Sequence, residues 1–321
     1  MNISVLYQNI ASEMNRVDEE LKRLVAVEHP VMTEAASHLL MAGGKRLRPA
    51  FVLMGGQFFP NPKANLVPLA AAIELVHMAS LVHDDVIDCS ATRRGVPTVK
   101  ARWGNRISMQ TGDYLFAKAL ILISGYQDVR IVRILADVSV KMVEGEIQQL
   151  LTAYDTQQSV KDYLDRIRRK TALLISTSFQ LGAIANGAPE ESVKALVRYG
   201  YYLGMAFQIT DDILDLTSTE EVLGKAVGSD LTQGILTLPV IYALREERGS
   251  ALKELIERLQ GGEAVIQEAL QEVYQSSGIE RARGFVERYI AKAQRELEKL
   301  PDRPAKRTLG SLAEFINVRE Y

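Results

Sequence analysis

The spacing of the prolines is the feature that most constrains the fold of this chain. After Pro97 the next proline is Pro189, and because proline disrupts a helix interior, a stretch this long without one can hold long helices. The stretch is rich in Ala, Leu, Ile, Gln, Lys and Arg, and apolar residues recur at helical spacing, as at Ile131, Leu135 and Val138. Alternation typical of strands is hard to find. The sequence therefore predicts an all-α protein of about ten or more long helices.

The predicted breaks between helices are short. They fall at residues 41–49, 59–62, 92–97, 186–189, 223–234 and 300–304. None of them resembles a long Ser/Gly/Pro linker, and no repeat of fixed period appears, so the sequence favours a single domain over residues 1–321. The last third, from Arg245 onward, is amphipathic and charged, and we expect it to serve packing.

Composition excludes several classes of function. The chain has 321 residues, of which 47% are hydrophobic and 24% charged, which suits a globular protein rather than a disordered one. The net charge of -2 gives no global basic field for nucleic acid, so any anion site must be local. A single cysteine, Cys89, and the absence of zinc-type Cys/His spacing argue against disulfides and soft metals.

The N-terminal sequence lacks the basic and apolar regions of a secretory signal peptide. No run reaches the roughly 18 uncharged apolar residues that would span a bilayer. The best candidate, Leu66–Val82, is interrupted by Glu74 and His77. We therefore expect a cytoplasmic protein.

Two aspartate clusters carry the chemistry. The first lies in the segment VHDDVID, and the second lies in QITDDILDLT. On a helix, residues i and i+4 share one face, so the first and last carboxylates of each cluster can converge on one hard cation. Oxygen ligands suit Mg²⁺, which commonly bridges protein carboxylates and substrate phosphates. The six candidate metal ligands are Asp84, Asp85, Asp88, Asp211, Asp212 and Asp215.

One such cluster on an exposed helix face would be most simply explained as a solvated surface. Two copies on apolar helices need another account, because carboxylates at i and i+4 repel each other by a few tenths of a kcal/mol without a counter-ion. A shared role in metal binding explains both. Each cluster follows an apolar segment without proline, so we expect each to lie near a helix end.

Basic groups suited to phosphate are placed around these clusters. Residues 41–49 read MAGGKRLRP, in which glycines free the backbone and Lys45 and Arg48 precede a helix start at Pro49. Arg93 and Arg94 follow the first cluster in the loop TRRGVP, and paired arginines give bidentate contacts to phosphate. Each of these could be an ordinary surface charge. Further candidates are Arg168-Arg169-Lys170-Thr171 on a predicted helix, Phe207-Gln208 one turn before the second cluster, and Lys225 in LGKAVGSD.

In this order the motifs resemble the trans-isoprenyl diphosphate synthase family over most of the chain. The matching elements are GGKRLRP, HxxxxxHDDVID with RRG, GD at Gly112-Asp113, KT, FQITDDILD, GK and GSD. The chain is most similar to the catalytic components (component II) of bacterial two-component heptaprenyl diphosphate synthases. The resemblance implies a bundle of long helices around a deep cavity, with the two clusters facing each other at its mouth.

The resemblance also implies a role for each candidate residue. Asp84, Asp88 and Asp211 would be direct Mg²⁺ ligands, with several ions per site, and Asp85, Asp212 and Asp215 would be further ligands or supports. Isopentenyl diphosphate would be bound by Lys45, Arg48, His77 and Arg94. The allylic diphosphate would be held by Arg93, Lys170 and Lys225. Lys170, Thr171 and Gln208 would form the catalytic group, the last two presenting oxygen dipoles to the developing cation.

One departure from the family pattern concerns the allylic site. The family often has GKxTLP where this chain has Gly234-Ile235-Leu236-Thr237-Leu238-Pro239, so a lysine is missing and Lys170 and Lys225 take on more weight. In the implied reaction, ionisation of the allylic diphosphate is stabilised by Mg²⁺ and cationic side chains, and the isopentenyl double bond attacks the cation. A proton is then lost to the departing diphosphate.

Product length can be inferred from the helix that carries Asp84. If this helix lines the cavity, Ser80, Ala79, Val76 and Ile73 lie progressively deeper at about 1.5 Å per residue. Short-chain members of the family typically place aromatic rings at the first two of these positions. The small residues here predict a long product, heptaprenyl diphosphate for a quinone such as menaquinone. The other explanation is that Ala79 and Ser80 are small because neighbouring helices pack closely.

Three alternatives stay open at this point. A shorter product, from geranylgeranyl to hexaprenyl diphosphate, would change only the cavity. A class I terpene cyclase usually lacks the second DDxxD and the GGKRLRP corner. A non-catalytic partner subunit would have lost the aspartates. The implied partners are isopentenyl and allylic diphosphates, and a small non-catalytic subunit or a second copy, with no nucleic acid and with transient membrane association on product release.

Overall fold

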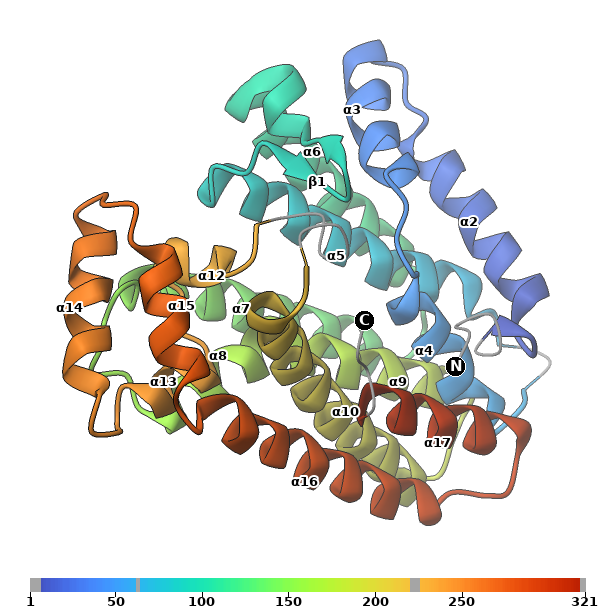
Figure 1. Cartoon of the computed structure of the whole chain (residues 1–321). Helices are drawn as coiled ribbons and strands as arrows, with labels where there is room; N and C mark the ends of the chain where they lie inside the picture. The colour runs from blue at the N-terminus through green and yellow to red at the C-terminus, as the bar shows by residue number, and fades with distance from the viewer. Residues whose placement is uncertain (1–6, 62–63, 220–225, 318–321) are drawn as a thin grey trace. The chain divides into compact units, whose positions relative to one another are not determined.

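The computed structural model describes residues 7–61, 64–219 and 226–317 (Figure 1). It confirms the all-α prediction, since the described part of the chain has many helices and only one two-stranded hairpin. The earlier helices are α2 (Ala11–Val25), α3 (Pro30–Met41), α4 (Leu47–Gln57), α5 (Val67–Ile87), α6 (Val99–Ser124) and α7 (Val129–Leu151). The later ones are α8 (Val160–Ile167), a π-helical turn (Arg168–Ala172), α9 (Leu173–Ala185), α10 (Glu190–Thr217), α12 (Ser229–Thr232), α13 (Leu238–Ala243), α14 (Gly249–Gln260), α15 (Ile266–Tyr274), α16 (Gly278–Glu298) and α17 (Pro304–Asn317).

The chain divides into two compact units, and it passes repeatedly from one to the other. Unit 1 comprises Met1–Ser139, Leu174–Val197 and Glu298–Leu309. Unit 2 comprises Val140–Leu173, Arg198–Leu297 and Gly310–Tyr321. The single domain expected from the sequence stays a prediction.

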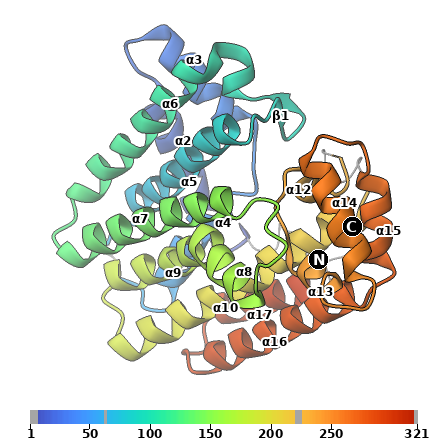
Figure 2. The same ribbon diagram turned by 90° about the vertical axis from the view of Figure 1, so that its left-hand side faces the viewer.

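Helix α5 forms the core of unit 1. It contacts α2, α4 and α6, which lie beside it in Figures 1 and 2. A helix that is apolar on all sides must be buried, and the residues from Leu69 to Val76 are all buried. Among the described residues, α5 is the one helix long and apolar enough to cross a membrane, and 72% of its most apolar window is buried inside the protein. It is therefore explained as a core helix. Its one buried charge along this stretch, Glu74, accepts a hydrogen bond from Arg46 Nη1 at 2.8 Å.

A short hairpin joins α5 to α6, where the sequence predicted a loop. Strand β1 (Thr92–Arg93) pairs antiparallel with β2 (Val96–Pro97), and Arg93 faces Val96. The two turn residues, Arg94 and Gly95, have φ values of 53° and 78°. Two positive φ angles in a two-residue connection are typical of the turns that match strand twist. The hairpin therefore holds Arg94 in the left-handed region that a residue with a long side chain rarely adopts.

In unit 2 the π-helical turn lies between two helices that approach it closely. A Cβ atom added to Gly145 of α7 would lie 2.9 Å from Cβ of Arg169, and one added to Gly204 of α10 would lie 2.7 Å from Cα of Ala172. Both distances are too short for a side chain, so the two glycines allow the backbones to meet. Isolated π turns inside helices occur frequently at functional sites. The sequence predicted a helix here, without this local widening.

Candidate functional site

Both aspartate clusters lie at the C-terminal ends of their helices, as the sequence predicted. Asp84 and Asp85 are in the last turn of α5, and Asp88 follows the helix and donates its N–H to the carbonyl of Asp84 at 2.8 Å. The second cluster lies in the last two turns of α10, which ends at Thr217. The partial negative charge at a helix C-terminus disfavours carboxylates. These positions cost stability unless cations compensate them, which favours a functional explanation.

The first cluster has an outer and an inner part. Asp84 and Asp88 are half-exposed, whereas Asp85 is only 1% exposed. Asp85 Oδ1 accepts hydrogen bonds from Nε of Arg93 at 2.9 Å and pairs with its Nη2 at 2.8 Å. Its other oxygen, Oδ2, is buried and has no hydrogen-bond partner within the described ranges. A buried carboxylate oxygen without a partner is unfavourable, and a cation bound beside Asp84 and Asp88 would compensate it.

The second cluster shows the same division. Asp211 is half-exposed, while Asp212 and Asp215 are buried. Asp215 accepts hydrogen bonds from the hydroxyl of Ser229 at 2.9 Å and from the backbone N–H of Asp230 at 3.2 Å. These bonds fix the start of α12, so Asp215 supports the local backbone.

Asp212 is held by two side chains. Its Oδ2 accepts from the hydroxyl of Tyr163 at 2.6 Å, and its Oδ1 accepts from Nε2 of Gln208 at 2.8 Å. Burial and the nearby charge of Asp230 raise the pKa of Asp212 to about 7, and the two hydrogen bonds oppose that rise. Burial, then the charge of Asp212, raises the pKa of Tyr163, so its hydroxyl stays protonated and donates.

The donor set fits magnesium shared with a substrate. Among the described residues, no three His, Cys, Asp or Glu side chains converge closely enough to hold a metal by themselves. Mg²⁺ keeps several waters and typically takes one or two protein carboxylates together with substrate phosphates. Half-exposed Asp84, Asp88 and Asp211 suit that arrangement, and the buried oxygen of Asp85 adds a site that attracts cations. Because the two clusters belong to different units, their facing each other stays a prediction.

A group of arginines surrounds His77 in unit 1. Burial lowers the pKa of His77 well below its usual value, and the positive charges of Arg48, Arg94, Arg93 and Arg46 lower it further, in that order. The imidazole is therefore neutral and can donate one hydrogen bond and accept another. Four guanidinium groups act on this one histidine, and those that acidic side chains do not neutralise are suited to an anionic ligand.

The members of this basic group differ in their protein partners. The guanidinium of Arg46 is bound by partners within the protein. It contacts Glu74 at 2.8 Å and Asp18 at 3.5 Å and donates to the carbonyl of Leu40 at 2.9 Å. Arg93 is paired with Asp85. Arg48 is half-exposed and Lys45 is exposed. The structure thus supports leaving Arg46 out of the candidate ligands.

Arg94, at the turn of the hairpin, packs on the glycine corner. A Cβ atom added to Gly44, whose φ is 140°, would lie 2.5 Å from Nη1 of Arg94. Only glycine satisfies both the backbone angle and the contact. Partial burial lowers the pKa of Arg94, Arg46 and Arg93 lower it further, and Glu74 opposes them. Arg94 forms no ion pair or side-chain hydrogen bond with the other described residues. The structure therefore brings together the two basic motifs that the sequence proposed.

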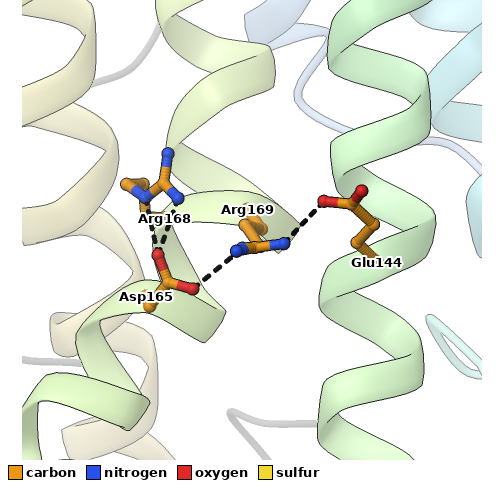
Figure 3. A network of polar contacts seen from close by, with 4 residues as sticks. All are labelled: Glu144, Asp165, Arg168 and Arg169. Atoms are coloured by element: carbon orange, nitrogen blue, oxygen red, sulfur yellow. Dashed lines mark hydrogen bonds and ion pairs between the residues drawn. The ribbon is translucent and has the colours of Figure 1, made fainter.

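In the π-helical turn, Arg168 and Arg169 are held by ion pairs, and the next two residues, Lys170 and Thr171, contact other candidate residues. Figure 3 shows Arg168 and Arg169 both bound to Asp165, with Nη2 of Arg168 at 2.6 Å and Nε of Arg169 at 2.8 Å. Arg169 also donates to Glu144 of α7 at 2.6 Å. This network ties the turn to the helices on either side, so these two arginines stabilise it.

Lys170 and Thr171 make contacts that relate them to other candidate residues. Nζ of Lys170 donates to Glu146 at 2.8 Å, and the hydroxyl of Thr171 donates to Oε1 of Gln208 at 2.6 Å. Thr171 and Gln208, which are far apart in the sequence, are therefore in direct contact. Lys225 lies outside the described residues, and its role at the allylic diphosphate stays a prediction.

Sequence reasoning missed several side chains that organise this region. Tyr163, Glu74 and Glu146 hold Asp212, Arg46 and Lys170 respectively. In the sequence Tyr163 lies one helical turn from Ile167, a spacing that indicates only a core position, and each glutamate resembles an ordinary helix residue. No local signal distinguishes them, because their importance comes from contacts with distant segments.

The helical protein has two acidic clusters at helix ends, which suit Mg²⁺, and arginines that suit a diphosphate. These features are typical of a transferase that acts on diphosphate substrates. The polyprenyl synthetase family model matches residues 29–273. The chain is 47% identical to heptaprenyl diphosphate synthase component 2 of Geobacillus stearothermophilus over 324 residues, covering 100% of both proteins. The chain belongs to the polyprenyl synthetase family, and it is a prenyltransferase that elongates prenyl chains in the trans configuration.

Solved structures agree with this assignment. The crystal structure of heptaprenyl diphosphate synthase from Staphylococcus aureus is 37% identical, with a TM-score of 0.91 and 99% of both chains covered. The polyprenyl synthase from Caulobacter crescentus CB15, complexed with calcium and isoprenyl diphosphate, is 32% identical, with a TM-score of 0.94 over 99% of this chain and 98% of that one. The family resemblance seen in the motifs is confirmed.

Proposed function

We propose that this chain performs Mg²⁺-dependent, consecutive condensation of isopentenyl diphosphate onto an allylic diphosphate, from farnesyl to heptaprenyl diphosphate, for a quinone side chain. The observation that carries the proposal is the pairing of each acidic helix end with groups suited to a diphosphate. In unit 1 these are the arginines around His77, and in unit 2 they are Lys170 and Thr171. Two distinct diphosphate sites fit a reaction that joins two diphosphate substrates.

Cationic side chains stabilise the negative charge of the two diphosphates during the reaction. The bond between the allylic carbon and the diphosphate oxygen breaks, and its electrons leave with the diphosphate, which Arg93, Lys170 and Lys225 stabilise. The isopentenyl double bond forms the new carbon–carbon bond, while Lys45, Arg48, His77 and Arg94 hold its diphosphate. The positive charge then lies on the inner carbon of the former double bond, and a proton is lost from the neighbouring carbon on the diphosphate side to the departing diphosphate. The electrons of that C–H bond form the new allylic double bond. His77 is neutral and serves as a hydrogen-bonding group.

Magnesium would be held by Asp84, Asp88 and Asp211, with Asp85, Asp212 and Asp215 supporting them. When bound, it would supply positive charge to the leaving diphosphate. The relative from Caulobacter crescentus is described as a complex with calcium, another hard divalent cation. The chain's own carboxylates thus supply the oxygen ligands that such ions prefer.

The long product is supported by the residues that precede Asp84 on α5. Ser80 is half-exposed, Ala79 and Val76 are each 3% exposed, and Ile73 is fully buried. Burial thus increases away from the cluster over about 16 Å of helix. No aromatic ring stands at Ala79 or Ser80 to stop a growing chain. The Geobacillus relative is named for a heptaprenyl product.

We also propose a partner subunit and a single catalytic domain in the cytoplasm, with transient membrane association as the product leaves. The Geobacillus relative is named as the second component of its synthase, which implies a first. In unit 2, helix α7 exposes a row of apolar residues at spacings of three and four. They are Val140, Val143, Ile147 and Leu150, each at least half-exposed, followed by Leu151 at 80%. Such a seam is typical of helices that pack against another chain.

The test is an assay of the purified chain with Mg²⁺, farnesyl diphosphate and labelled isopentenyl diphosphate, with and without a candidate small subunit. We expect label in prenol products of seven isoprene units after removal of the diphosphate. Shorter products would support the short-chain alternative. Absence of incorporation under both conditions, with cyclic hydrocarbon formed instead, would support a terpene cyclase.

A further inference from the structure

Both oxygens of Asp212 accept hydrogen bonds from the protein. It is 4% exposed, its Oδ2 accepts from Tyr163 at 2.6 Å, and its Oδ1 accepts from Gln208 at 2.8 Å. Its neighbour Asp211, in contrast, is half-exposed. The middle carboxylate of this cluster is thus engaged within the protein.

The two bonds fix a direction of hydrogen bonding that reaches Thr171. An amide nitrogen only donates, so the contact between Nε2 of Gln208 and Oδ1 of Asp212 makes that oxygen the acceptor and leaves Oε1 of Gln208 facing the other way. That oxygen accepts from the hydroxyl of Thr171 at 2.6 Å. The hydrogen of Thr171 is therefore directed to Gln208, and the lone pairs of its oxygen are left on the other side. Each bond in the series determines the orientation of the next.

Tyr163 begins the series of hydrogen bonds that runs through Asp212 and Gln208 to Thr171, and its own side chain is held in place. Its side chain is fully buried, and the guanidinium of Arg166 lies 5.5 Å from its ring centroid. Arg166 in turn donates to the carbonyl of Leu236 at 2.7 Å and to Oε1 of Gln158 at 3.1 Å. Tyr163 therefore has one orientation available, and its hydroxyl fixes the carboxylate plane of Asp212.

We propose that Tyr163 and Asp212 are positioning residues, which set the orientation of the Gln208 amide and the Thr171 hydroxyl so that the oxygen of Thr171 faces the allylic carbon as it becomes positive. This inference rests on the proposed function, because Thr171 has a catalytic role only if the chain ionises an allylic diphosphate. Neither Tyr163 nor Asp212 touches the substrate. Tyr163 and Asp212 affect the substrate through Gln208 and Thr171.

The first test compares Tyr163→Phe with Tyr199→Phe, which removes the same atom from another fully buried tyrosine of unit 2. Misplacement of a reacting group can cost about 100-fold in rate, so we expect Tyr163→Phe to lower kcat by about 10- to 100-fold. The KM for the allylic diphosphate should change by less than about threefold, because binding depends on other groups. Equal kcat values for the two variants would overturn the proposal.

A double-mutant cycle distinguishes positioning from general loss of structure. Thr171→Val removes the hydroxyl on which Tyr163 is proposed to act. If Tyr163 acts through Thr171, adding Tyr163→Phe to Thr171→Val should lower kcat by less than about threefold further, whereas independent effects would multiply. Thr171→Ser keeps the hydroxyl and should restore the sensitivity to Tyr163→Phe. Multiplying effects would overturn the proposal.

The conformation of the variants is checked by thermal unfolding followed by circular dichroism. Asp212→Asn provides a second route, since an asparagine amide cannot accept from both Tyr163 and Gln208, and it should reproduce the loss of kcat. If the wild-type protein is active but the effects of Tyr163→Phe and Thr171→Val on kcat are independent, only this inference is contradicted. A wild-type protein that incorporates no isopentenyl unit contradicts the proposed function and this inference together.

Discussion

At the scale of single residues, the partners of each charged side chain decide its function. Three arginines near His77 illustrate this, since Arg46 is paired with Glu74 and Arg93 with Asp85, whereas Arg94 has no ion pair among the described residues. A guanidinium that is held in a strained turn and forms no ion pair with the other described residues is suited to an anionic ligand. From the motif RRG in the sequence alone, Arg93 and Arg94 cannot be distinguished.

We therefore predict that Arg94→Gln raises the KM for isopentenyl diphosphate by about 10- to 100-fold, the equivalent of one charge-assisted hydrogen bond of about 1.5–3 kcal/mol. The melting temperature should change little, because no protein partner is lost. Arg106→Gln is the matched control, since Arg106 is an exposed arginine of α6. Initial rates at varied isopentenyl diphosphate measure the effect. Similar KM values for Arg94→Gln and Arg106→Gln would contradict the assignment.

At the scale of elements, the π-helical turn is stabilised by ionic contacts that depend on pH. Burial alone would raise the pKa of Asp165, but its hydrogen bonds and charge interactions with Arg168 and Arg169 outweigh burial and lower it. A carboxyl group whose pKa is lower in the folded protein adds stability above its unfolded pKa, near 3.9. That stability is lost as the pH falls through the folded pKa.

We predict that Asp165→Asn lowers the free energy of unfolding by about 1–2 kcal/mol at pH 7, because two arginines lose a charged partner. The difference from the wild-type protein should shrink as the pH falls below about 4. Urea titrations at several pH values measure it, with Asp137→Asn, an exposed aspartate of α7, as the control. A difference that is constant with pH would show that the effect is not ionic.

Helix α5 gives a second prediction at this scale. Phenylalanine in place of Ala79 or Ser80 should stop chain growth one to two turns from Asp84, and the product should shorten by several isoprene units. Chromatography of the dephosphorylated prenols measures the distribution. Ala251→Phe, at an exposed alanine of α14, is a control for adding an aromatic ring elsewhere. If both α5 variants keep the wild-type product length, the two small residues serve helix packing only.

At the scale of the whole molecule, the apolar row on α7 is the described surface best suited to bury another chain. Isolated exposed apolar residues are ordinary, but a row of four at a spacing of three and four residues is typical of an interface. The partner subunit that we propose for this chain is the proposed occupant of this surface.

We predict that Val143→Lys combined with Ile147→Lys prevents assembly with the partner subunit, since two charges would be buried without partners. Light scattering after size exclusion gives the mass with and without the partner. Met41→Lys, at a position 74% exposed on α3, is the control. If the double variant still forms the complex, the partner binds elsewhere. If it changes only the mass of the chain alone, the row joins two copies.

The sequence by itself determined the features that depend on local spacing. The absence of proline over residues 98–188 predicted the helices, and the apolar, proline-free segments before the two clusters predicted the acidic helix ends at Asp84 and Asp211. Carboxylates one turn apart predicted a shared cation, because a helix fixes which residues share a face. The basic motifs were found from their residue types and from their order around the two clusters. That order, and the family resemblance that it carries, indicated diphosphate chemistry.

Only the tertiary structure decided which of these groups are available to a ligand. It showed that Asp212 is bound to Tyr163, that Arg46 is bound to Glu74, and that Arg94 packs over Gly44. These contacts join segments from tens of residues apart, and the hairpin turn and π-helical turn that enable them arise from packing rather than from local preference. A sequence pattern fixes neighbours along one helix, whereas the charge that a side chain retains depends on what the rest of the chain brings beside it.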